Sequence, residues 1–202
     1  MKVVLDQVEM HGCSDSISDA IERAAEDAAN RGRMVVEVRV DGHLVEDVHL
    51  GQADQDHPGA QEVSMTTMAP CELLFNTFTE AGNATEESIE QAAEAAELIQ
   101  SGRTVEAMDR MKEFLATWES INAALSQGLQ LLGIDPEEGQ FEQRPIARVL
   151  EDVHARLECL AEAIRSDDHS GLSDVLGHEF PETARSMGRL LTHLGTCCRN
   201  EG

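Results

Sequence analysis

The sequence predicts an α+β protein in which a small sheet with one helix precedes a mainly antiparallel helical bundle. Two observations indicate this class: alternating β-branched residues stop at Pro70, and long stretches of apolar residues at helical spacing follow it. Because 41% of the 202 residues are hydrophobic, the chain can bury a core. We expect a small α/β domain over 1–69, a connector helix and turn over 70–84, and a four-helix-type bundle over 85–202.

The N-terminal domain is predicted to have the order β-α-β-β-β. A strand over 3–8 comes first, and a capping box at Ser16 then starts a helix that ends near Gly32. A second strand over 34–40 leads into the hairpin signal Asp41-Gly42. The rest of the domain is a third strand, a loop over 51–60 and a last strand over 61–68.

The hairpin admits two registers. Its face is defined by the alternating valines Val36, Val38 and Val40. A two-residue turn would add His43, Val45 and Asp47 to this face, and a three-residue turn would add Leu44, Glu46 and Val48 instead. We expect the three-residue turn because it buries two aliphatic side chains beside one acid.

Helix-start and helix-stop signals divide the remainder. The connector helix from Pro70 should end at Gly82-Asn83, and Thr85 should cap a helix that ends at Gly102. A long helix should then run from Thr104 to just before Asp135-Pro136.

Two more helical segments complete the predicted bundle. Pro145 should open a helix with an apolar heptad formed by Ile146, Leu150, Val153, Leu157, Leu160 and Ile164. The segment over 170–198 should be helical, with a kink or break at Pro181.

Charge and composition exclude several functions. The formal net charge of −24 comes from 39 acidic and 15 basic residues, so the surface should repel nucleic acid and anionic lipid. No stretch is long and apolar enough for a signal peptide or a membrane span, and the five cysteines are unevenly spaced. We therefore expect a cytoplasmic protein, whose acidity reflects either a basic partner or solubility and adaptation to salt.

The motifs of the common enzyme classes are missing from the sequence. It contains no P-loop, G-x-G-x-x-G, G-x-S-x-G, H-E-x-x-H or C-x-x-C motif. The two lysines, Lys2 and Lys112, do not stand in a phosphate-binding context. We expect no cofactor.

Histidine and cysteine residues offer weak candidates for metal binding. Glu151 and His154 form a Glu-x-x-His unit on a predicted helix, which we interpret as a solvated helix flank because a di-metal bundle needs a second copy on another helix. His193 and Cys197, with Cys198 adjacent, could hold a soft metal only if another helix supplied ligands such as His154. Small hydrophobic and surface groups are the preferred interpretation.

Two cysteines are weak candidates for catalysis. Cys71 follows Pro70 at a predicted helix start, where a thiol pKa falls, and Cys13 stands two residues after His11. Either thiol could act with a nearby histidine, although free cysteines are more often small buried hydrophobes. Methionines at helical spacing and Trp118 are interpreted as core.

The leading hypothesis is a non-enzymatic protein-interaction module, an acidic adaptor or chaperone-like protein that acts through an apolar seam of its bundle. Its partner would be another protein or a second copy, giving a possible homodimer. The alternative is a cysteine-dependent enzyme or redox or metal sensor that uses Cys71, Cys13 or the pair His193 and Cys197.

Overall fold

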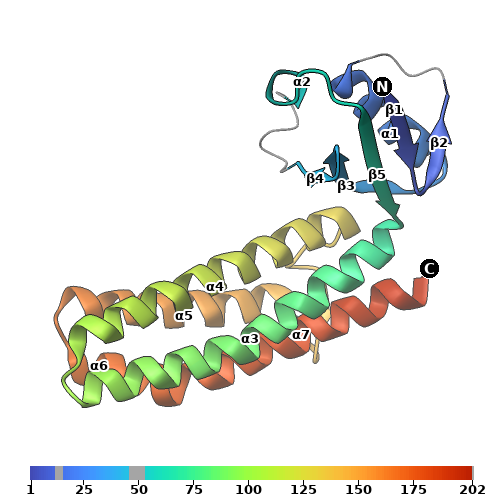
Figure 1. Cartoon of the computed structure of the whole chain (residues 1–202). Coiled ribbons are helices and arrows are strands. Elements are labelled where there is room, and N and C mark those ends of the chain that lie inside the picture. Colours follow the sequence, from blue (N-terminus) through green and yellow to red (C-terminus); the bar gives the residue numbers. More distant parts are fainter. Residues whose placement is uncertain (12–15, 46–52, 202) are drawn as a thin grey trace. The chain divides into compact units, whose positions relative to one another are not determined.

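The computed structural model describes residues 1–11, 16–45 and 53–201, and the chain forms two compact units, Met1–Leu73 and Leu74–Gly202 (Figure 1). The first unit contains a sheet and a helix, and the second consists of long packed helices. The predicted α+β class is therefore confirmed.

In the first unit, five strands form one mixed sheet in the order β2-β1-β5-β3-β4. β1 and β5 pair in parallel, and the other neighbouring strands are antiparallel. The strands are β1 (Lys2–Leu5), β2 (Val8–Met10), β3 (Met34–Val40), β4 (His43–Leu44) and β5 (Glu62–Met68).

One helix, α1 (Ile17–Asn30), packs against this sheet through its small apolar side chains. The predicted cap is present, because the Ser16 hydroxyl accepts a hydrogen bond from the backbone N–H of Asp19 at 3.3 Å. The core between helix and sheet contains Val3, Leu5, Ile17, Ala20, Ala24, Val38, Val40, Val45, Val63 and Met65.

The predicted first strand is wrong, because residues 3–8 form parts of two strands. Asp6 and Gln7 both have positive φ, 49° and 68°, and make a two-residue turn between β1 and β2. Neither is glycine, so the sequence carried no hairpin signal here.

The expected register of the second hairpin is also wrong. Val40 pairs with His43 across a two-residue turn in which Asp41 and Gly42 both have positive φ. Such a turn matches the natural twist of paired strands. Val45 is consequently 7% exposed and Leu44 59% exposed, while Glu46 and Val48 lie outside the described residues.

Two smaller departures occur nearby. A β-bulge between Val35 and Glu37 turns Val36 out of the valine face, so that Val36 is exposed. The predicted loop over 51–60 contains the short helix α2 (Ala53–Asp56), and its first two residues lie outside the described part of the chain.

The second unit is built on four long helices that run alongside one another (Figure 1). They are α3 (Pro70–Gln100), which enters this unit at Leu74, α4 (Thr104–Leu132), α5 (Ile146–Arg165) and α7 (Phe180–Glu201). Shorter elements are the hairpin β6 (Gln140–Phe141) and β7 (Arg144–Pro145), the helix α6 (His169–Asp174) and the π-helix η2 (Val175–Glu179).

The connector helix does not end at Gly82-Asn83, and this prediction is wrong. α3 continues without interruption to Gln100, and Thr85 lies inside it rather than at a cap. The buried Thr85 hydroxyl donates to the Gly82 carbonyl at 2.6 Å and faces Gly188 of α7. Contact with α7 therefore overrides the local stop signal.

Other helix boundaries agree with the sequence. Gly102 and Gly133 both adopt positive φ after α3 and α4, as C-terminal glycines do. The final segment is interrupted by η2 just before Pro181, where a break was predicted. Trp118 is 1% exposed and packs edge-on against Phe180, with ring centroids 5.0 Å apart, which confirms its place in the core.

Candidate functional site

An apolar strip along α4 and α5 is only partly covered. Its residues recur at intervals of seven on each helix, with the polar Asn122 interrupting the series on α4, and we call the strip the α4–α5 seam. It consists of Met108, Leu115 and Leu129 on α4 and Leu150, Leu157 and Ile164 on α5. At one end of the seam, Leu115 is 44% exposed and Ile164 is 41% exposed.

The heptad on α5 explains why the seam exists. Ile146, Val153 and Leu160 form one line of this heptad, and all three are buried. The other line consists of Leu150, Leu157 and Ile164 and belongs to the seam. It lies on the side of the helix nearer to solvent, and its residues are half-buried or exposed. The bundle therefore buries one of the two apolar lines of this heptad and leaves the other partly exposed.

A cavity of about 420 Å³ lies between the two helices at the other end of the seam. Leu125 and Leu129 of α4 line it together with Leu150 of α5, and Ile134 and Pro136 close it from the intervening loop. The two helices are thus separated enough to admit further apolar side chains.

Charged groups border the seam and are largely paired with each other. On α5, Glu151 pairs with Arg148, and His154 lies 3.2 Å from Glu158. On α4, Lys112 pairs with Asp109 at 2.8 Å, and this pair raises the pKa of Lys112. Glu151 and His154 are exposed and contact their own helix neighbours rather than each other.

A second hollow, the α3–α7 groove, has a volume of about 860 Å³. Gly188 allows the two helices to approach along it, because a Cβ atom there would stand 2.6 Å from Oγ1 of Thr85. Its α7 wall carries Arg185, Arg189, Thr192, His193 and Thr196, its α3 wall carries Phe75, Thr79, Asn83 and Glu86, and the hairpin adds Phe141 and Glu142.

The hairpin holds one of the groove's arginines. Glu142 accepts from the Arg189 Nε at 3.1 Å, while Arg185 lies 3.8 Å from Glu182 on its own helix. Glu142 and Gln143 both have positive φ and form the turn between β6 and β7. No turn dipeptide signals this hairpin in the sequence, so sequence reasoning missed the site.

Of the candidate soft-metal pair, His193 lines this groove. The Cys197 thiol is 3.9 Å from Nε2 of His193, and both side chains are exposed. Cys198 is buried, and His154 is not among the groove residues. Within residues 1–11, 16–45 and 53–201, no three His, Cys, Asp or Glu side chains gather as a metal site would require.

Cys71 has no hydrogen bond to a histidine among the residues that the structure describes. Cys71 is the second residue of α3 and is half-buried, and its thiol makes no hydrogen bond to any side chain that the structure describes. His11 is exposed beside the hollow next to Arg23 and Arg31. Cys13 lies outside the described residues.

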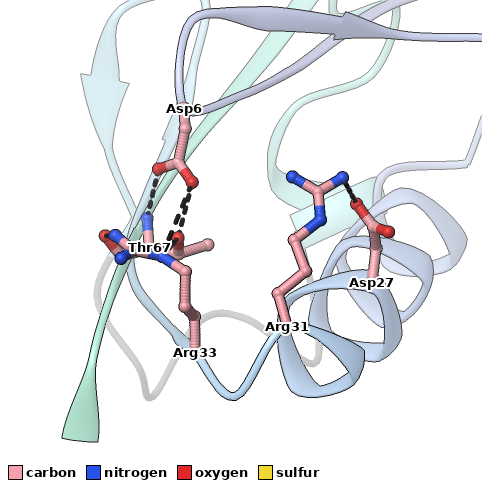
Figure 2. A network of polar contacts seen from close by, with 5 residues as sticks. All are labelled: Asp6, Asp27, Arg31, Arg33 and Thr67. Atoms are coloured by element: carbon pink, nitrogen blue, oxygen red, sulfur yellow. Dashed lines mark hydrogen bonds and ion pairs between the residues drawn. The ribbon is translucent and has the colours of Figure 1, made fainter.

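The polar cluster in Figure 2 belongs to the first unit and is fully paired. Asp6 accepts hydrogen bonds from the N–H of Thr67 at 2.7 Å and from its hydroxyl, and these bonds lower the pKa of Asp6. Arg33 donates to the hydroxyl and carbonyl of Thr67, and Arg31 pairs separately with Asp27. The cluster ties the first turn to β5.

A family model described as a domain of unknown function (DUF8042) matches residues 76–187. The match contains the whole α4–α5 seam, whereas the groove residues from Gly188 onward lie beyond it. No curated protein and no solved structure matches the chain. Among the described residues, no helix has the length and apolarity needed to cross a bilayer.

Proposed function

Because the chain belongs to the DUF8042 family, whose description assigns no activity, we propose a function from the helical unit: a non-enzymatic module that binds an amphipathic helix of a partner protein along the α4–α5 seam. The observation that carries this proposal is the partly exposed apolar series at seven-residue spacing on two neighbouring helices, in which Leu115 and Ile164 are the most exposed.

The geometry of the seam favours a helix as its ligand. Residues seven apart lie two turns apart, so the two series give two rows of apolar side chains with a furrow between them. From Leu115 to Leu129 the furrow is about 21 Å long, which matches about four turns of a bound helix. The cavity beside Leu150 would accept one large apolar side chain of that helix.

Charge favours a partner with basic flanks. Residues 74–202 include 24 acidic and 10 basic side chains, a formal charge of −14. Around the seam, several of the basic side chains are already paired within their own helix. A helix with lysines or arginines on either side of its apolar stripe would therefore be attracted at long range and oriented at contact.

The cysteine-dependent alternative has no comparable support. The thiol of Cys71 is not activated by any described histidine, and the pair His193 and Cys197 supplies two ligands at most from one exposed helix face. We therefore retain the interaction function alone.

The test uses surface residues on and off the seam. Leu115→Glu and Ile164→Glu place a charge on the seam, and Val105→Glu and Leu131→Glu place the same charge on exposed positions of α4 outside the seven-residue series. All four residues are exposed, so the fold should persist, which circular dichroism checks.

Tagged full-length protein and the four variants are purified from the cells that produce it, and co-purifying proteins are quantified by mass spectrometry. We expect a partner that is retained by wild type and both controls and lost from both seam variants. Equal recovery with all variants, or no reproducible partner with wild type, would contradict the proposal.

A further inference from the structure

The α3–α7 groove carries a separate inference. We propose that this groove is a symmetric interface through which two copies of the chain form a dimer. The proposal does not depend on the seam, because the groove is formed by a different pair of helices.

The two walls of the groove differ in charge. Among the residues that line the groove, α3 contributes one charged side chain, Glu86, and α3 carries no lysine or arginine between Glu80 and Glu97. The α7 side carries Arg185 and Arg189 in the groove and Arg199 over the ring of Phe75, 5.3 Å from its centroid. A surface with one acidic and one basic wall is complementary to a copy of itself.

The levels of the opposing charges also agree. Gly188 lies against Thr85 and Gly195 lies against Phe78, so α3 and α7 run antiparallel. Glu86 and Arg189, the next residue on each helix, consequently lie at one level of the groove. A two-fold axis along the helices would place Glu86 of the second copy over Arg185 and Arg189, and the same contact would occur once more by symmetry.

Not all of these charges are satisfied within one copy. Glu86 is exposed and takes part in no ion pair within the described residues. Arg185 is half-exposed, and its nearest carboxylate, Glu182, is 3.8 Å away. Both groups are therefore available to a second copy.

The groove sets the centre of the interface. On α3 its lining runs from Phe75 to Glu86, about 17 Å along the helix. Helices pack about 9 Å apart, so the groove covers roughly 300 Å² on each copy, and a standard interface of about 800 Å² per partner requires the contact to continue along both helices beyond it. The glycines and threonines of the groove leave few bulky side chains to hold two copies apart, and Phe75 supplies apolar surface at one end.

The overall charge makes the prediction specific. Two copies with a net charge of −24 repel each other, so an attractive interface must bring opposite charges together locally. In the groove, the acidic and basic walls meet this requirement.

A charge-swap experiment on the full chain tests the dimer. Sedimentation equilibrium measures the dimer dissociation constant of wild type, of Glu86→Arg, of Arg185→Glu and of the double variant, with Glu119→Arg on α4 as the control. We expect each single groove variant to weaken the dimer at least about tenfold, because like charges then face each other. The double variant should restore it, and the control should leave it intact.

Three outcomes would each overturn the proposal. The wild type is monomeric up to its solubility limit, the single variants do not weaken the dimer, or the double variant does not restore dimer affinity. A dimer that dissociates with Leu115→Glu instead would assign self-association to the seam. Co-purification of a partner with the seam variants is a separate measurement from the dimer dissociation constant. Failure of one proposal therefore does not imply failure of the other.

Discussion

Gly128 of α4 lies directly beneath the ring of Phe78 on α3. A Cβ atom at position 128 would stand 2.3 Å from Cζ of that ring, which is itself fully buried. The glycine therefore sets the distance between the first two helices of the bundle.

Gly128→Ala should destabilise the helical unit by roughly 1–3 kcal/mol, because the buried ring has no room to yield. Gly82→Ala is the matched control: it is also a glycine inside a helix, but its nearest neighbour would be 3.9 Å away at Thr192. That variant should gain up to about 1 kcal/mol from helix propensity. Urea unfolding followed by circular dichroism measures both, and a shift in the same direction would refute the packing argument.

Asp54 should make the first unit sensitive to acid. Its carboxylate accepts from the N–H groups of Ile17 and Ser18 and from the Ser16 hydroxyl, at 2.6, 3.1 and 3.0 Å. Bonds from Ser18 and Ile17 lower the pKa of Asp54 from 3.8 to about 2. Since the folded pKa is the lower one, the stabilisation is present above the unfolded value and is lost as pH falls through about 4 to 2.

Hydrogen exchange of the α1 amides measures this effect in the full chain. Asp54→Asn should exchange faster than wild type at neutral pH, and the difference should shrink below about pH 4. Glu22→Gln, an exposed change on the same helix, should have no such dependence. A difference that stays constant with pH would contradict the assignment.

Thr67→Val should cost about 1–2 kcal/mol, because the methyl group can neither donate to Asp6 nor accept from Arg33. Thr67→Ser keeps the hydroxyl and should cost less. Thermal unfolding by circular dichroism compares the two, and equal losses would mean that packing, and not the hydroxyl, carries the contact.

Gln91→Met should stabilise the bundle by about 1 kcal/mol. Oε1 of Gln91 is buried and accepts no hydrogen bond from any described residue, so removing it relieves an unpaired polar atom at similar side-chain volume. Chemical denaturation measures the change. A loss of stability would show that this oxygen has a partner in solution.

Sequence patterns predicted the elements whose signals are local. Ser16 starts α1, Gly102 and Gly133 follow α3 and α4, and Thr104 begins α4 as expected. The start at Ser16 rests on a side-chain cap and the two helix ends on left-handed glycines, which act within one helical turn, whereas α4 begins without a side-chain cap. Long-range contacts do not enter these predictions.

The sequence predictions were wrong where contacts between residues far apart in the chain determine the structure. Gly82-Asn83 resembles a helix end, but Thr85 and Gly188 pack two helices together there and keep α3 continuous. The heptad on α5 did predict an apolar seam. Which of its two apolar lines stays exposed depends on how α4 packs. The sequence alone therefore does not show that Leu115 and Ile164 are exposed.

Trp118 has a practical consequence for all of these measurements. It is the single tryptophan of a chain without tyrosine, and it lies buried between helices of the second unit against Phe180. Intrinsic fluorescence excited at the indole band will therefore report only the melting of the helical unit. The sheet unit is optically silent by this probe, so comparing emission with far-ultraviolet ellipticity separates the unfolding of the two units without any label.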